Sequence, residues 1–127
     1  MIKTLAFDFG ASSGRAILGQ YDGKRLTLEE THRFPNNPVQ IGNSLHWDVL
    51  RLFYEIKQGI VQTVHQGHRD IASIGIDTWG VDFGLLDAQG NLLGNPYHYR
   101  DSRTDGMLDA ACRIAGREEI FGQTGIE

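Results

Sequence analysis

The sequence has 127 residues with one cysteine, and its acidic side chains outnumber the basic ones to give a net charge of −4. A hydrophobic content of 40% is ordinary for a soluble globular protein, and the length suits one domain with a substantial core. The acidic balance argues against a nucleic-acid-binding surface, which needs clustered lysine and arginine. No apolar run approaches the ~18 residues of a membrane span, and no secretion signal opens the sequence. The single Cys112 has no intrachain disulfide partner, so we expect a cytoplasmic protein.

The first predicted strand, residues 2–9, is almost continuously apolar from Leu5 onward and carries one carboxylate, Asp8. This pattern is typical of a central strand covered on both faces. A carboxylate there is costly to desolvate unless a metal or hydrogen bonds compensate it. Residues 10–14 then supply a row of backbone N–H groups with little side-chain bulk, which favours a concave anion site.

A carboxylate for hydrated Mg²⁺ beside backbone N–H groups for phosphate oxygens is the pattern of a nucleotide-phosphate site. The alternative interpretation is a plain β-hairpin with a small-residue turn. The pattern is neither a Walker loop, because no Gly-Lys-Ser/Thr follows, nor a Rossmann fingerprint, because residues 15–21 have the pattern of a strand.

The next elements follow in order. Residues 15–21 and 25–34 are predicted strands joined by a turn at 22–24, and the Pro, Asn and Gly content of residues 35–44 predicts a loop. Asp48 is a candidate N-cap for a helix that runs to about His65, with Gly67 as its stop signal. Apolar residues recur there at helical spacing: Val49, Leu52, Phe53, Ile56, Ile60, Val61 and Val64.

The second half begins with an apolar strand over residues 71–76 that ends at Asp77. Strands are predicted at 81–86 and 91–93, a short extended piece at 96–99, a helix at 104–115 and a helical turn at 117–121. The side chains predicted to face inward from the longer helix are Met107, Leu108, Ala111, Ile114 and Ala115. Three strands followed by a helical crossover predict a mixed sheet with helices on its faces.

A second polar cluster, residues 77–82, follows that strand. Open α/β sheets bind ligands beyond the carboxyl ends of their strands, where Asp77 is expected. Gly80 allows a ligand close to the backbone, while Trp79 either stacks on a sugar or base or fills a core gap. Asp82 either points to the same rim or is a solvated strand carboxylate. A further polar group either hydrogen-bonds a polyol or forms a surface ion-pair cluster: Arg100, Asp101 and Arg103.

Four stretches resemble the FGGY family of carbohydrate kinases, and the match is nearest to its members that phosphorylate L-rhamnulose. They span nearly the whole chain: Asp8-Phe9-Gly10-Ala11-Ser12-Ser13-Gly14-Arg15, His46-Trp47-Asp48-Val49, residues 73–83 (Ser-Ile-Gly-Ile-Asp-Thr-Trp-Gly-Val-Asp-Phe) and Tyr99-Arg100-Asp101-Ser102-Arg103-Thr104. The Thr-Trp-Gly-Val-Asp segment is the most discriminating of them.

The resemblance implies an α/β fold, namely the N-terminal part of a ribonuclease H-like (actin-like ATPase) domain with a mixed β-sheet flanked by helices. Residues 1–127 would be the N-terminal part of the first kinase domain, without the second. The implied reaction is MgATP-dependent phosphorylation of L-rhamnulose to L-rhamnulose 1-phosphate in rhamnose catabolism.

The resemblance also assigns residues. Asp8 would hold Mg²⁺, Gly80 would contact the ketose, and Trp79 and Asp82 would lie near it. The ATP phosphates would lie against a run of five residues: Ala11, Ser12, Ser13, Gly14 and Arg15. The general base and adenine pocket are expected beyond residue 127, so no catalytic residue is assigned and the chain alone is expected to be inactive.

Three alternatives stay open. The first alternative is that the chain is a non-catalytic nucleotide- or sugar-binding fragment. The second is that it belongs to a kinase of the same family that acts on another ketose. The third alternative is a two-metal nuclease, in which Asp8 and Asp77 at two strand ends would share the metals. The acidic net charge of the chain disfavours this alternative. We also expect an exposed apolar sheet edge to promote self-association of the chain.

Overall fold

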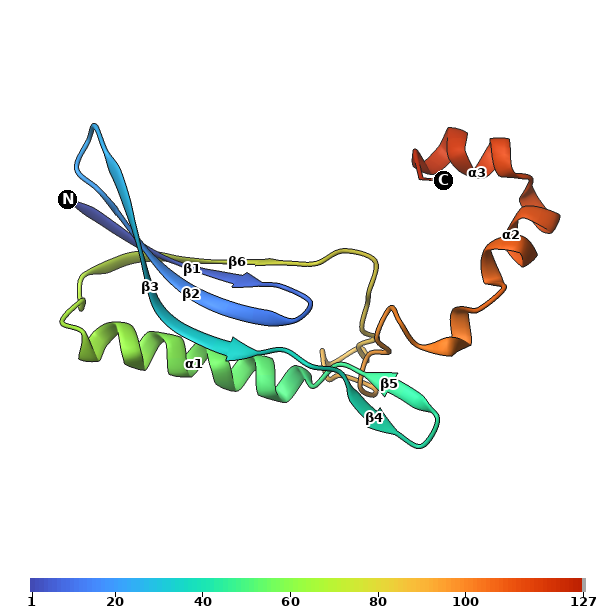
Figure 1. Cartoon of the computed structure of the whole chain (residues 1–127), viewed down its shortest axis with the longest axis horizontal. Helices are drawn as coiled ribbons and strands as arrows, with labels where there is room; N and C mark the ends of the chain where they lie inside the picture. The colour runs from blue at the N-terminus through green and yellow to red at the C-terminus, as the bar shows by residue number, and fades with distance from the viewer. Residues whose placement is uncertain (127) are drawn as a thin grey trace.

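The structure is a computed structural model that describes residues 1–126. It contains a four-stranded sheet, with helix α1 (Val49–His65) along one face of it and a small hairpin beside one end (Figure 1). The strands of the sheet are β1 (Ile2–Phe9), β2 (Ser13–Tyr21), β3 (Leu26–Pro35) and β6 (Ile71–Thr78). The remaining elements are β4 (Val39–Ile41), β5 (Ser44–His46), a 3₁₀ turn (Ser102–Thr104), α2 (Met107–Ala115) and α3 (Arg117–Thr124).

The sheet has the order β3-β2-β1-β6 and is mixed. β1, β2 and β3 are joined by tight turns and pair antiparallel, whereas β6 returns through α1 and pairs parallel with β1. The Asp22 carboxylate accepts the backbone N–H groups of Lys24 and Arg25 at 2.8 and 2.7 Å, which fixes the β2–β3 turn. The mixed α/β sheet predicted from the sequence is therefore confirmed.

Helix α1 packs its apolar face on the sheet. It begins where the Asp48 side chain accepts the N–H of Arg51 at 3.0 Å, and Gly67 follows its end with a φ of 95°. Gly59 lies against the sheet so closely that a Cβ there would be 2.6 Å from the Phe7 ring. Leu52, Ile56 and Ile60 of α1 pack against a buried cluster beneath the helix. This cluster consists of Leu5, Phe7, Phe9, Ala16 and Phe34.

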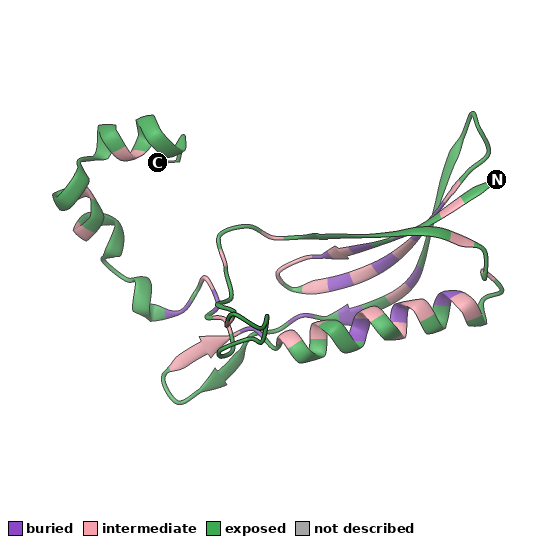
Figure 2. Ribbon diagram, turned by 180° about the vertical axis from the view of Figure 1, so that it is seen from behind, coloured by how far each residue is buried: buried purple, intermediate pink, exposed green. Residues whose placement is uncertain are grey.

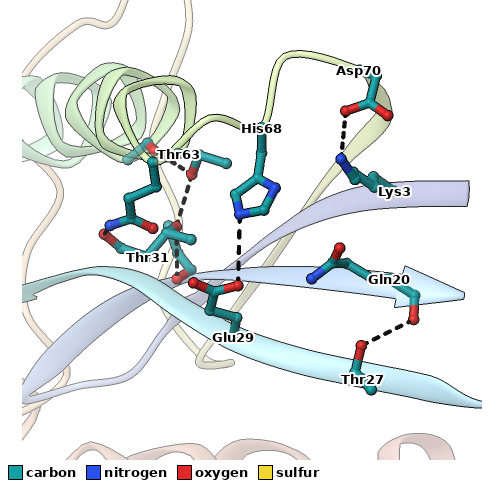
Figure 3. Close-up of polar contacts among 11 residues, drawn as sticks. Lys3, Gln20, Thr27, Glu29, Thr31, Thr63, His68 and Asp70 are labelled. Carbon is teal, nitrogen blue, oxygen red and sulfur yellow. Dashed lines mark hydrogen bonds and ion pairs between the residues drawn. The ribbon is translucent and has the colours of Figure 1, made fainter. Parts of the chain in front are cut away.

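Polar contacts hold the far end of α1 and the loop after it to the sheet (Figure 3). The buried hydroxyls of Thr31 and Thr63 lie 2.8 Å apart and join β3 to α1. Lys3 Nζ lies 2.6 Å from an oxygen of Asp70, which connects the start of β1 to the loop before β6. These contacts tie α1 and the loop before β6 to the sheet, whereas the position of β6 along β1 is given by the backbone pairing of the two strands.

Parts of the sheet surface are uncovered (Figure 2). β6 is an edge strand, and its Ile74 and Ile76 side chains are 50% and 55% exposed. Helices α2 and α3 lie away from the sheet (Figure 1). The α2 side chains predicted to face inward therefore meet no core, and Ile114 is 88% exposed.

The structure corrects two predictions about local structure. Residues 35–44, predicted as a loop, contain β4 and the start of β5, which pair as a hairpin. In the described part of the chain, the strands predicted at residues 81–86 and 91–93 are not formed. These two segments pair only through a single bridge between Leu86 and Leu92. No helix within residues 1–126 combines the length and apolarity needed to cross a membrane.

Candidate functional site

The turn between β1 and β2 is tight and glycine-dependent. The N–H of Gly10 donates to the Ser13 carbonyl at 3.0 Å, and a Cβ on Gly10 would lie 2.8 Å from that same oxygen. At the other end of the turn, a Cβ on Gly14 would lie 2.0 Å from the ring of Phe34. Both glycines are therefore required by close approach, and the turn keeps a narrow backbone path from residue 10 to residue 14.

The buried side chain of Asn36 holds this turn from outside. Its Nδ2 donates to the Gly10 carbonyl at 2.8 Å, and its backbone N–H donates to the Ser12 carbonyl at 3.0 Å. Two carbonyls of the turn are thus directed toward Asn36. Sequence reasoning missed this residue, because an asparagine in a Pro- and Asn-rich stretch has the pattern of an ordinary loop.

Three charged residues occupy paired positions on neighbouring strands. Asp8 is paired in register with Arg15 on antiparallel β2 and with Asp77 on parallel β6. An Arg15 guanidinium nitrogen donates to Asp8 Oδ2, and both side chains are 40% exposed. Residues directly paired across a sheet project from the same face, so both carboxylates and the guanidinium lie on one side of it.

This arrangement bears on the choice between one metal and two. Mg²⁺ is commonly held by one or two carboxylates together with substrate phosphates and water, which the Asp8 and Asp77 pair can provide. Within residues 1–126 no group of three or more His, Cys, Asp or Glu residues gathers. The register of β1 and β6 thus supplies two neighbouring carboxylates, a number that a single hydrated cation commonly uses.

The second predicted cluster is organised by a pair of tryptophans. The indole N–H groups of Trp47 and Trp79 both donate to Asp82 Oδ2, at 2.6 and 2.8 Å. The two indoles pack with ring centroids 3.9 Å apart, and Trp47 is only 2% exposed. Trp79 is partly buried and packs against the hydrophobic core, which agrees with its packing interpretation. Asp82 is half-buried and hydrogen-bonded rather than a solvated strand carboxylate.

A pocket of about 670 Å³ opens beside this cluster. Asp82 lines it, whereas Gly80 and Trp79 do not; Gly80 is exposed, with open space beside its Cα. The wall mixes aromatic and polar side chains, including Tyr97, His98, Tyr99, Arg103 and Thr104. Such a wall offers apolar surface for sugar rings and donors or acceptors for hydroxyls.

His98 is a polar member of that wall which sequence reasoning missed. It is 2% exposed and packs against Trp47 with ring centroids 4.1 Å apart. Burial lowers the pKa of His98, the Arg100 charge adds to the effect and the Asp82 charge opposes it. Its Nδ1 accepts the backbone N–H of Arg100 at 3.0 Å, so the neutral ring carries its proton on Nε2.

In the group at residues 100–103, Asp101 differs from both interpretations made from the sequence, whereas Arg103 lines the pocket. Asp101 is buried and accepts the backbone N–H groups of Leu45 and Arg103 at 2.6 and 2.9 Å, which hold its pKa below the usual range. Arg103 lies over the Tyr97 ring, 3.8 Å from its centroid. Asp101 is thus a structural link between β5 and the 3₁₀ turn, and neither a polyol ligand nor part of a surface ion-pair cluster.

The two clusters lie at one edge of the sheet. β1 and β6 are parallel, and Phe9 and Thr78, their last residues, are paired in register. The turn at residues 10–14 leaves one strand, and residues 79–82 leave its neighbour. The turn at residues 10–14 and the pocket beside Asp82 therefore both follow the carboxyl ends of adjacent parallel strands, where open α/β sheets bind ligands.

Comparison with known proteins agrees with this arrangement. Residues 3–127 match the FGGY family of carbohydrate kinases, N-terminal domain. The chain belongs to this family. Among curated FGGY relatives, a rhamnulokinase of Bacteroides thetaiotaomicron is 48% identical over 96% of this chain, and one of Oceanobacillus iheyensis is 45% identical over 97%. The chain spans about a quarter of the length of these two relatives, 25% and 26%.

Solved FGGY structures share the fold. A gluconate kinase from Lactobacillus acidophilus superposes with a TM-score of 0.78 at 17% identity, covering 98% of this chain and 25% of that one. A xylulose kinase from the same organism gives a TM-score of 0.75 at 16% identity, over 95% of this chain and 24% of that one. At such identities the likeness establishes the FGGY fold and confirms the predicted fold class.

Proposed function

We propose that the complete protein containing this chain transfers the γ-phosphate of ATP to L-rhamnulose, giving L-rhamnulose 1-phosphate. The observation that carries the proposal is the placement of the turn at residues 10–14 and the Asp82 pocket beyond the paired ends of β1 and β6. FGGY kinases use ATP, and the relatives named rhamnulokinase support L-rhamnulose as the sugar.

The nucleotide side of the proposal uses residues 8–15. Ala11, Ser12 and Ser13 would meet the phosphates with backbone N–H groups, Gly14 would allow close approach, and Arg15 would neutralise phosphate charge. Asp8 would hold a hydrated Mg²⁺, with Asp77 beside it in register. When bound, the cation would offset the negative charge that develops on the phosphates during phosphoryl transfer.

The sugar side uses the segment after β6. Asp82, oriented by two indole N–H groups, would accept hydrogen bonds from ketose hydroxyls, and Gly80 would allow the sugar near the backbone. Trp79 would act mainly by packing, because it donates to Asp82 and borders the core. Positioning of the two substrates and charge neutralisation are the main requirements of this reaction.

A second candidate is binding without turnover by the 127-residue chain itself. It is favoured by the contacts of two site carboxylates: Asp8 is paired with Arg15 and Asp82 with two tryptophans, so neither is free to take the proton of the sugar hydroxyl. The base would then belong to the part of the protein outside this chain.

The proposal is tested by assaying the complete protein with MgATP against L-rhamnulose, L-fuculose and D-xylulose. We expect the kcat/KM for L-rhamnulose to exceed the others by at least about tenfold, since one hydrogen bond between a sugar hydroxyl and the charged Asp82 contributes about 1.5–3 kcal/mol. A preference for another ketose would reassign the substrate within the family, and no phosphorylation of any ketose would overturn the proposal.

A further inference from the structure

Trp47 joins two segments that lie 35 residues apart in the sequence, and it does so through one oxygen atom. Its indole N–H donates to Asp82 Oδ2 at 2.6 Å, and the same oxygen accepts the indole of Trp79 at 2.8 Å. Trp47 precedes α1, whereas Trp79 and Asp82 follow β6. The orientation of the Asp82 carboxylate is therefore fixed in part from outside its own segment.

Beside Asp82 the backbone is strained. Val81 has a φ of 71°, and in residues 1–126 it is the one residue other than glycine with a positive φ. A β-branched side chain is disfavoured in this region, so the conformation persists only where neighbours hold it. The Val81 side chain is 82% exposed and contributes little packing of its own. The adjacent Asp82, in contrast, is held by the two indole N–H groups that donate to its side chain.

Trp47 does not line the 670 Å³ pocket, which Val81 and Asp82 do line. It lies behind them, 2% exposed, between the rings of Trp79 and His98. Any influence of Trp47 on a ligand in the pocket must therefore pass through the residues of the wall.

We propose that Trp47 is a positioning residue for the sugar pocket: its indole N–H fixes the Asp82 carboxylate and so holds the Val81 backbone in the left-handed region. This inference rests on the proposed function. The ketose then meets a wall that is already formed, and the cost of ordering Asp82 is met during folding rather than during binding. Loss of the N–H is expected to weaken ketose binding more than ATP binding.

The test uses Trp47→Phe, which removes the donor and keeps an aromatic ring, in the complete protein. We expect the KM for L-rhamnulose to rise by about tenfold, the size typical of losing a hydrogen bond to a charged group. The KM for ATP should change by less than about twofold, because the residues proposed for the phosphates are not in contact with Trp47.

A matched control is Thr63→Val, which breaks the buried contact with Thr31 far from the pocket (Figure 3). It is expected to lower the unfolding midpoint while leaving both KM values unchanged. A Trp47→Phe protein that behaves like Thr63→Val, less stable but with unchanged KM for the ketose, would overturn the positioning role.

Val81→Gly removes the strain without removing the hydrogen bond. Each single variant changes the ketose KM by some factor. If Trp47 acts by holding this backbone, the factor for the double variant Trp47→Phe/Val81→Gly is expected to be smaller than the product of the two single factors. Strictly multiplicative effects would overturn the link between Trp47 and Val81. Should Trp47→Phe fail to fold, the same comparison is made with Trp79→Phe, which removes the second donor to Asp82 Oδ2.

Failure of the inference and failure of the proposed function give different results. An unmodified protein that phosphorylates no ketose overturns the function and, with it, the sugar-pocket role. An active unmodified protein whose Trp47→Phe variant keeps its ketose KM overturns the inference alone.

Discussion

Asp8 and Asp77 are directly paired in the register of the parallel strands β1 and β6, so two carboxylates stand side by side at the carboxyl edge of the sheet. Arg15 is the partner of Asp8 on the opposite side. Asp8 therefore has the positive Arg15 on one neighbouring strand and the negative Asp77 on the other, and our first prediction concerns this residue.

Replacing Asp8 with Asn is expected to raise the Mg²⁺ concentration needed for half-maximal activity by about tenfold or more, as expected for loss of a charge-assisted contact. The measurement is the initial rate of phosphoryl transfer at saturating ketose over a Mg²⁺ titration. Asp70→Asn, which removes an exposed ion pair with Lys3, serves as the control and should leave the titration unchanged. An unaltered Mg²⁺ dependence of the Asp8 variant would remove Asp8 from the cation site.

Replacing Asn36 with Ala is expected to loosen the turn at residues 10–14, because the Gly10 carbonyl loses its 2.8 Å donor. A hydrogen bond of this kind contributes about 1 kcal/mol, so the KM for ATP should rise about fivefold. Steady-state kinetics with ATP varied at saturating ketose provides the measurement. The neighbouring exposed Asn37→Ala is the control, and equal effects of the two substitutions would contradict the role given to Asn36.

Acid is expected to destabilise the protein in part through His98. Its pKa in the folded protein is lowered, chiefly by burial, relative to an unfolded value of about 6.5. The unfolded chain therefore binds the proton more readily, and the stability that the neutral ring contributes is present above about pH 6.5 and is lost as the pH falls toward the lower folded pKa.

The measurement is the urea unfolding midpoint of the complete protein between pH 7.5 and 5. His98→Asn keeps an acceptor for the Arg100 N–H without a titrating ring, so its midpoint should fall less steeply below pH 6.5. His65→Asn, at an exposed position at the end of α1, should retain the full slope. Parallel slopes for all three proteins would show that His98 does not contribute.

The isolated 127-residue chain is expected to self-associate, because the edge strand β6 has unpaired backbone groups and exposed Ile74 and Ile76 side chains. Sedimentation velocity at increasing concentration should show oligomers, and Ile76→Lys should shift the distribution toward monomer. The control variant is Leu50→Lys, which introduces the same charge at an exposed apolar position on α1. A chain that stays monomeric throughout contradicts the expectation.

The elements predicted correctly from the sequence are those whose signal lies within the element itself. Strand β1, the glycine-bounded turn and α1 with its Asp48 cap were predicted from local apolar spacing and cap residues, which depend on neighbours in the chain. Residues 81–86 alternate like a strand but have no partner strand among the described residues, so their alternation gave a wrong prediction.

The supporting residues of the site depend on contacts between distant segments. Asn36 reaches Gly10 across 26 residues and Trp47 reaches Asp82 across 35, and neither spacing leaves a local signal. The positive φ of Val81 could not be predicted from the sequence either, because a β-branched side chain favours the opposite backbone region.

The most direct test of the proposed function is a phosphoryl-transfer assay with MgATP and L-rhamnulose on both the complete protein and the 127-residue chain. We expect the complete protein to form L-rhamnulose 1-phosphate and the chain alone to form none, since no general base is assigned within residues 1–126. Absence of product from the complete protein would contradict the proposed function. Turnover by the chain alone would contradict the placement of the base outside it.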